Sequence, residues 1–189
     1  MKTMTPTLEA QMPLPSPLGL LTLAATARGL ALVWFEGQAH RTATLAAPVD
    51  ARHPHLALAA RELQAYFTSP QAAFTVPLDP AGTPFQQAVW QVLRGIGPGS
   101  LLSYGGVAQA LQRPAAVRAV GAAIGRNPLS IVVPCHRVVG RSGALTGYAG
   151  GLARKQALLQ LEGAVPEAAA AGGTAAPARA AAHANRRSA

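Results

Sequence analysis

The amino-acid sequence predicts two small α/β domains in series. Half of the 189 residues are hydrophobic and only 12% are charged, so the chain can bury a core and the disordered class is excluded. Before residue 82, short apolar runs precede a helical pattern, whereas later segments are mainly helical. The chain breaker Asp79-Pro80-Ala81-Gly82 separates these patterns and predicts domains at residues 1–82 and 83–166.

The first domain is predicted to hold two short strands and one helix. The apolar runs 18–26 and 29–35 read as strands joined by a turn at Arg28. Residues 53–67 follow a helical period, with Pro54 early, where its missing N–H costs little. The apolar face of this helix carries Leu56, Leu63, Tyr66 and Phe67.

The second domain is predicted to begin with three helices. Thr83 is an N-cap, followed by Pro84 and by Gln86 at the capping-box position, and its helix ends at the glycines 95–99. A short helix over 104–111 follows its cap Ser103. Arg113-Pro114 breaks that helix and opens a third at 115–124. The helix-turn-helix order is typical of DNA-binding domains.

The rest of the chain contains a β-branched run, a loop and a last helix. Residues 131–140 read as strand on both sides of Pro134-Cys135-His136-Arg137. A glycine-rich loop over 142–151 precedes a helix at 152–161. Residues 167–189, rich in alanine and basic, are predicted to form a disordered tail.

Charge is distributed unevenly between the two halves. Residues 1–82 carry five basic and five acidic side chains, whereas residues 83–166 carry eight basic and one acidic, a net charge of +7. This asymmetry indicates that the second half meets a polyanion, nucleic acid first and an anionic membrane second. The alternative explanation of this charge is that the source organism has generally basic proteins.

The chain has one cysteine, Cys135, so an intrachain disulfide is excluded. The first 17 residues contain Glu9 and several prolines and do not read as a signal peptide. No run of 18 apolar residues predicts a membrane span. We therefore expect a cytoplasmic protein with a reduced thiol and no membrane partner.

Cys135 is the candidate nucleophile. A lone cysteine is more often an inert buried residue, but His136 and Arg137 follow at once, and a base or positive charge favours the reactive thiolate. On an extended segment, adjacent side chains point to opposite sides, so a kink or a bridging water would have to connect Cys135 with His136. One cysteine and scattered histidines do not make a zinc site, and GGVAQAL is not a phosphate-binding loop, so neither metal nor cofactor is expected.

Several motifs, in order, resemble the methylated-DNA–protein-cysteine methyltransferase family, the O6-alkylguanine-DNA alkyltransferases. They are FQQAVWQVL, LSYGGVAQAL, AVRAVGAAI, GRNP, PCHRVV, SGALTGYAGG and LLQLEG. The resemblance is strong over residues 83–163 and looser over 16–82, through SPLGLLTL and LVWFEG. It implies a ribonuclease-H-like first domain and a winged-helix-like reactive second domain.

The resemblance implies a reaction and the residues that carry it. Cys135 corresponds to the alkyl-acceptor thiol and His136 to the base that deprotonates it through a water. Glu162 corresponds to the carboxylate that orients the histidine, and Asn127 to the asparagine that braces the turn. Displacement at the alkyl carbon leaves a thioether, so each molecule acts once and without a cofactor. O6-alkylguanine is the expected substrate, and O4-alkylthymine stays open.

The resemblance also implies how duplex DNA is held. The target nucleotide must leave the base stack, with Tyr104 binding the guanine and Arg118 filling the gap. The small residues of 115–124 suit close approach in the minor groove. The expected DNA-contacting residues are Arg118, Lys155, Ala119, Gly121, Ala122 and Tyr148. A monomer suffices. Ala149 departs from relatives that carry serine there, which leaves the preferred alkyl group open.

Two rival functions belong to other classes. A lesion-recognition protein would bind alkylguanine without reacting, but such relatives lack the acceptor that Cys135 supplies. A transcription regulator of this type would need additional cysteines and a further DNA-binding domain, which this sequence lacks.

Overall fold

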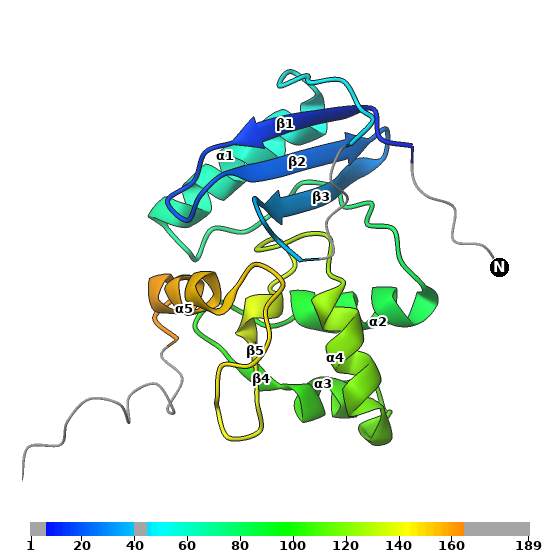
Figure 1. Ribbon diagram of the computed structural model, residues 1–189, viewed down its shortest axis with the longest axis vertical. Coiled ribbons are helices and arrows are strands. Elements are labelled where there is room, and N and C mark those ends of the chain that lie inside the picture. Colours follow the sequence, from blue (N-terminus) through cyan, green and yellow to red (C-terminus); the bar gives the residue numbers. More distant parts are fainter. Residues whose placement is uncertain (1–6, 40–44, 165–189) are drawn as a thin grey trace, which may run out of the picture.

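The computed structural model describes residues 7–39 and 45–164, and the predicted tail lies outside them. The first domain is an antiparallel sheet in the order β1-β2-β3, covered on one face by helix α1 (Figure 1). Its elements are β1 (Ala10–Leu14), β2 (Leu21–Thr26), β3 (Gly29–Phe35) and α1 (Pro54–Thr68). The two predicted strands and the predicted helix are therefore confirmed, and β1 is an addition.

Strand β1 was not predicted from the sequence, because it contains a proline. Pro13 pairs opposite Thr22 and cannot donate a hydrogen bond, which a strand tolerates at the edge of a sheet. On the other side of the sheet, β3 bonds to residues 77–79, with Leu30 N donating to Pro77 O at 2.8 Å. A Cβ at Gly29 would lie 2.4 Å from that same carbonyl oxygen, so the close approach requires glycine.

The second domain is mainly helical. Its elements are α2 (Pro84–Arg94), β4 (Leu102–Ser103), α3 (Tyr104–Ala110), a 3-10 turn (Pro114–Ala116), α4 (Val117–Gly125), a 3-10 turn (Cys135–Arg137), β5 (Val138–Val139) and α5 (Leu152–Leu161). The capping box at Thr83 is present with both of its hydrogen bonds, and the Ser103 hydroxyl accepts from Gly106 N. Trp90 Nε1 donates to Ala123 O at 3.0 Å and so ties α2 to α4. In Figure 1, α3 and α4 lie together at one end of the molecule.

The strand expected over residues 131–140 is wrong for most of its length. Only Val138–Val139 forms a strand, parallel to β4, while Cys135–Arg137 is a 3-10 turn. Ile131 has a φ of 72°, a conformation that β-branched residues rarely adopt. The reason is that local bonds replace those of a strand, because Val133 N donates to Leu129 O at 2.9 Å and Asn127 Nδ2 donates to Val133 O at 2.8 Å.

The two domains share a continuous apolar core, and the segment before Cys135 lies against the sheet. Val33 N of β3 donates to Pro128 O at 2.8 Å, and Ser130 N donates back to Val33 O at 3.0 Å. Ala39 N donates to Ala149 O at 2.9 Å, which joins the first domain to the glycine-rich loop. Strand β3 therefore supports the segment before the thiol, and the residues that follow β3 support the loop after it. Among the described residues, no helix is long and apolar enough to cross a membrane.

Candidate active site

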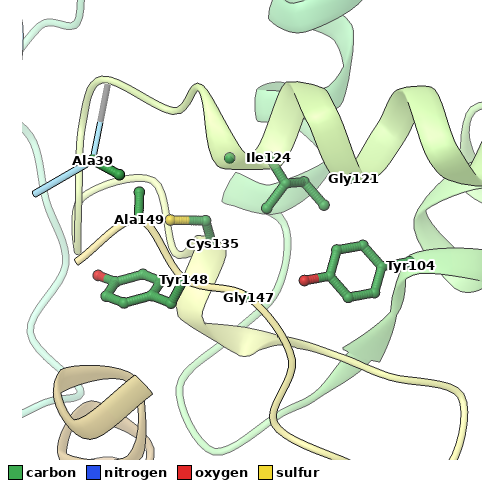
Figure 2. Close-up of a pocket in the computed structure, with 9 residues that line it drawn as sticks. Ala39, Tyr104, Gly121, Ile124, Cys135, Gly147, Tyr148 and Ala149 are labelled. Atoms are coloured by element: carbon green, nitrogen blue, oxygen red, sulfur yellow. The ribbon is translucent and has the colours of Figure 1, made fainter. Parts of the chain in front are cut away.

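Cys135 lies at the start of its 3-10 turn with its thiol at the wall of a pocket. The residue is 5% exposed, and the pocket has a volume of about 270 Å³. Figure 2 shows Tyr104 across the pocket from Cys135, with its hydroxyl directed inward. The lining residues are Ala39, Tyr104, Gly121, Ile124, Gly125, Cys135, Gly147, Tyr148 and Ala149. An apolar pocket with one nucleophile suits a planar ligand that carries a small reactive group.

The side-chain amide of Asn127 holds the turn that presents the thiol. Its Nδ2 donates to Val133 O at 2.8 Å and to Cys135 Sγ at 3.0 Å, and its Oδ1 accepts from Leu129 N at 3.0 Å. Burial is the largest influence on the Cys135 thiol and raises its pKa, while the Asn127 hydrogen bond and the Lys155 charge oppose that rise. Asn127 therefore both shapes the turn and favours the thiolate.

His136 and Glu162 form a fully buried pair. His136 Nε2 lies 2.8 Å from Glu162 Oε1, and neither side chain is exposed. Burial lowers the pKa of His136, so the ring is neutral and Nε2 carries the proton that the carboxylate accepts. The other nitrogen, Nδ1, has no hydrogen-bond partner among the described residues and is left as a free base.

Glu162 stays ionised because it receives four hydrogen bonds. Arg137 donates from Nε to Oε2 at 2.9 Å and from Nη2 to Oε1 at 2.8 Å, and Tyr66 OH donates to Oε1 at 2.7 Å. Burial alone would raise the pKa of Glu162, but the bonds from His136, Arg137 and Tyr66 outweigh it and lower the pKa to about 2. The pair is thus a neutral imidazole held by a permanent carboxylate.

Lys155 is buried on α5, behind the pocket loop. Its Nζ donates to Val138 O at 2.5 Å and to Thr146 O at 2.9 Å, so it ties the reactive turn to the loop. Burial lowers the pKa of Lys155 to about 8, partly opposed by the nearby Cys135. The charge, still largely present at neutral pH, lies close enough to favour the thiolate. Lys155 does not line the pocket itself.

Tyrosines form two walls of the pocket. Tyr104 OH donates to Thr146 O at 3.2 Å, and Tyr148 lies beside Cys135 (Figure 2). Gly150 permits the Tyr148 position, because a Cβ there would lie 2.7 Å from its ring. Burial raises the pKa of Tyr148 well above its ordinary value, so its hydroxyl stays protonated.

Helix α4 presents a face of mostly short side chains beside the pocket. Arg118, Ala119 and Ala122 are exposed on it, and Gly121 reaches the pocket lining. The opposite face buries Val120, Ala123 and Ile124 in the core. A face with short side chains and one cation allows a large anionic surface to approach closely.

The structure brings Cys135, Tyr104, Gly121 and Tyr148 to one pocket. The predicted residues Asn127, His136, Glu162 and Lys155 lie behind its wall, and Arg118, Ala119 and Ala122 lie on the surface beside it. Within residues 7–39 and 45–164, no three His, Cys, Asp or Glu side chains gather as a metal site would require.

Two residues of the site were missed by sequence reasoning. Arg137 was expected only as a positive charge near the thiol, but it is 6% exposed and bound to Glu162. The lone acid of residues 83–166, Glu162, was a signal that one arginine would be needed to balance it. Tyr66 read as an ordinary core residue, and nothing in the sequence links it to Glu162, 96 positions away.

Known proteins match this chain in both halves. A family model described as the ribonuclease-like domain of 6-O-methylguanine DNA methyltransferase matches residues 13–80, and the model of its DNA-binding domain matches residues 84–164. A methylated-DNA–protein-cysteine methyltransferase of Mycolicibacterium paratuberculosis is 46% identical over 147 residues, covering 78% of this chain and 88% of the relative. The Haemophilus influenzae enzyme of the same name is 41% identical over 154 residues, covering 78% and 83%.

Solved structures agree in fold. Mycobacterium tuberculosis OGT in complex with DNA is 42% identical, covers 83% of this chain and 95% of its own, and superposes with a TM-score of 0.76. The predicted fold class, a ribonuclease-like α/β domain and a helical DNA-binding domain, is confirmed. The chain belongs to the methylated-DNA–protein-cysteine methyltransferase family.

Proposed function

We propose that this chain repairs duplex DNA by moving the alkyl group of O6-alkylguanine onto Cys135 Sγ, once per molecule. The observation that carries the proposal is the position of the thiol. Cys135 lines a pocket across which Tyr104 lies, while the neutral His136–Glu162 pair lies behind it. Relatives named for this transfer, at 41% identity or more, support the same chemistry.

The proposed reaction is an in-line displacement at the alkyl carbon. The Cys135 proton passes through a water to the free Nδ1 of His136, and Glu162 stabilises the imidazolium that forms. The thiolate then forms a bond to the alkyl carbon as the bond from that carbon to O6 breaks. The guanine leaves as an anion, which the Tyr104 hydroxyl stabilises by turning its hydrogen bond from Thr146 O to the purine. A proton taken up at N1 from solvent then gives neutral guanine, and the His136 imidazolium returns a proton to solvent.

The proposed DNA interface is the exposed face of α4. Arg118 would occupy the gap left by the extruded nucleotide, while Ala119, Gly121 and Ala122 allow the groove to approach. Lys155 and Tyr148 would act on the extruded base, Lys155 by holding the loop at Thr146. We place the boundary between the ribonuclease-like domain and the reactive domain at residues 82 and 83.

The product explains why turnover stops. A thioether on Cys135 has no hydrolytic route back to a thiol in this site, so one alkyl group consumes one molecule. We propose O4-alkylthymine as a second substrate, because it presents the same oxygen-bound alkyl carbon. A reducing setting such as the cytoplasm suits an acceptor that must remain a thiol.

The direct test uses purified full-length protein and duplex DNA with one O6-methylguanine. Intact-mass measurement should show one added methyl group per molecule, peptide mapping should place it on Cys135, and the DNA should contain guanine again. The matched control is Cys135→Ser, which keeps the pocket and should stay unmodified. Tight binding of the lesion by wild-type protein without a mass gain would instead establish the recognition-only function.

A further inference from the structure

A tyrosine of the first domain reaches into the proton relay of the second. Tyr66, near the end of α1, is 1% exposed, and its hydroxyl donates to Glu162 Oε1 at 2.7 Å. Glu162 caps the C-terminal end of α5, and Figure 1 shows one end of α1 beside α5. The contact crosses the domain interface, so it depends on how the two domains are docked.

Oxygen Oε1 of Glu162 is crowded with donors. It accepts from Tyr66 at 2.7 Å, from Arg137 Nη2 at 2.8 Å and from His136 Nε2 at 2.8 Å, whereas within the part of the chain that the structure describes Oε2 accepts only from Arg137 Nε. A carboxylate oxygen has two lone pairs, so three donors on one oxygen share its charge density. The Tyr66 hydroxyl therefore competes directly with His136 for the same atom.

We propose that Tyr66 is a positioning residue for alkyl transfer: its hydroxyl limits how strongly Glu162 attracts the His136 proton and so keeps the imidazole neutral. This role rests on the function proposed above. A neutral ring offers the free Nδ1 that must take the proton of Cys135. A carboxylate without Tyr66 would hold the imidazolium more tightly, so the pH below which the protein loses its competent base would rise.

The other charges around His136 act with Tyr66. Arg137 and Lys155 are cations that oppose protonation of the ring, and Glu162 is the anion that favours it. Cys135, adjacent in sequence, is the proton donor. Tyr66 differs from these groups because its hydroxyl is uncharged and because it belongs to the first domain. Burial and the Glu162 contact raise the pKa of Tyr66 far above its ordinary value, so it remains a donor.

The hydroxyl can be removed with little change in packing. The centroid of the Tyr66 ring lies 5.5 Å from that of Phe67, edge-on, and 5.9 Å from that of Phe74. Tyr66→Phe preserves both ring contacts. The matched control is Phe67→Leu, which disturbs the packing beside Tyr66 but removes no hydrogen bond to Glu162. A packing role predicts similar effects from both variants, whereas the proposed role predicts a proton-affinity change from Tyr66→Phe alone.

The first measurement is the pKa of His136 by NMR, on full-length protein labelled at histidine and without DNA. Tyr66→Phe should raise the His136 pKa by about half a unit to one unit, less than the full size of one hydrogen bond to a charged group, because only part of the charge freed on Glu162 acts on His136. Phe67→Leu should leave it unchanged. An unchanged or lowered pKa in Tyr66→Phe overturns the proposal, and this readout does not depend on whether the protein transfers alkyl groups.

The second measurement is the pH dependence of single-turnover transfer from O6-methylguanine DNA. In Tyr66→Phe the acid limb of the rate profile should move to higher pH by the same amount as the His136 pKa. The rate on the alkaline plateau should be no lower than in wild type. A lower plateau with an unmoved limb would show a structural role only. Should wild-type protein transfer nothing, the proposed function fails and the NMR result alone decides the role of Tyr66.

A wild-type readout covers the case in which Tyr66→Phe does not fold. The Tyr66 hydroxyl proton should exchange slowly with solvent and show coupling to the Glu162 carboxyl carbon. A rapidly exchanging hydroxyl proton without that coupling would overturn the proposal.

Discussion

The guanidinium of Arg137 binds the carboxylate of Glu162 through two parallel hydrogen bonds, Nε to Oε2 at 2.9 Å and Nη2 to Oε1 at 2.8 Å. Its third nitrogen donates to Ile96 O, after α2. Both side chains of the pair are almost completely buried. The planar fork of arginine matches a carboxylate in a way that lysine cannot, so this ion pair fixes where the base of the relay points.

Arg137→Met tests that ion pair. The substitution leaves Glu162 as a buried charge without its main counterion, which typically costs about 3–5 kcal/mol of unfolding free energy. Denaturant unfolding measures the loss. Arg141→Met, which changes an exposed arginine in the next loop, should alter stability by no more than about 0.5 kcal/mol. Equal stabilities of the two variants would contradict a structural ion pair at Glu162.

The His136–Glu162 pair predicts loss of stability in acid. The pKa of His136 is lowered from 6.5 by burial, and that of Glu162 is lowered from 4.5 to about 2 by its hydrogen-bond donors despite burial. Groups with a depressed pKa in the folded protein contribute stability above their unfolded pKa, and this contribution is lost as pH falls. Unfolding free energy should therefore decline below pH 6.5 and more steeply from 4.5 toward 2.

His136→Gln separates the two contributions. Glutamine has no proton to gain in this range, so the decline between 6.5 and 4.5 should flatten while the steeper loss below 4.5 persists. The measurement is urea unfolding at several pH values across that range. A wild-type curve that is flat between 6.5 and 4.5 would mean that the buried ring is not held neutral.

Much of this site follows from local sequence, because the motifs keep their residues together. PCHR places Cys135 beside His136, and the capping signals of Thr83 and Ser103 predict where α2 and α3 begin. Composition alone could not show that the β-branched residues 131–133 form a turn and not a strand. Their conformation is decided by Asn127, whose amide takes the carbonyl oxygens of Leu129 and Val133.

Contacts between distant segments account for the features that the sequence did not predict. Strand β1 exists because its residues pair with β2, despite the proline that argues against a strand. The contacts of Arg137 and Tyr66 with Glu162 depend on where α5 ends relative to α1. Local patterns carry no information about such docking, since it is a property of tertiary packing.

Lys155→Met should make the thiol harder to ionise. The substitution keeps the length of the side chain but removes the charge that lowers the pKa of Cys135, so that pKa should rise by about one unit. Because the chain has one cysteine, the pH dependence of its alkylation by iodoacetamide reports the thiol directly. Gln156→Met, exposed on the same helix, is the control. An unmoved alkylation midpoint in folded Lys155→Met protein would rule out an electrostatic role for Lys155.

Arg118→Ala should separate DNA handling from chemistry. Arg118 is exposed on α4 and does not line the pocket, so its loss should slow transfer from duplex O6-methylguanine by about tenfold or more, since extruding a base costs a few kcal/mol. Transfer from a free O6-alkylguanine base, which needs no extrusion, should be unchanged. Single-turnover mass measurements with both substrates supply the comparison, and Arg61→Ala, exposed on α1, should affect neither. Equal slowing of both substrates would place Arg118 in the chemical step, and slowing of neither would remove α4 from the DNA interface.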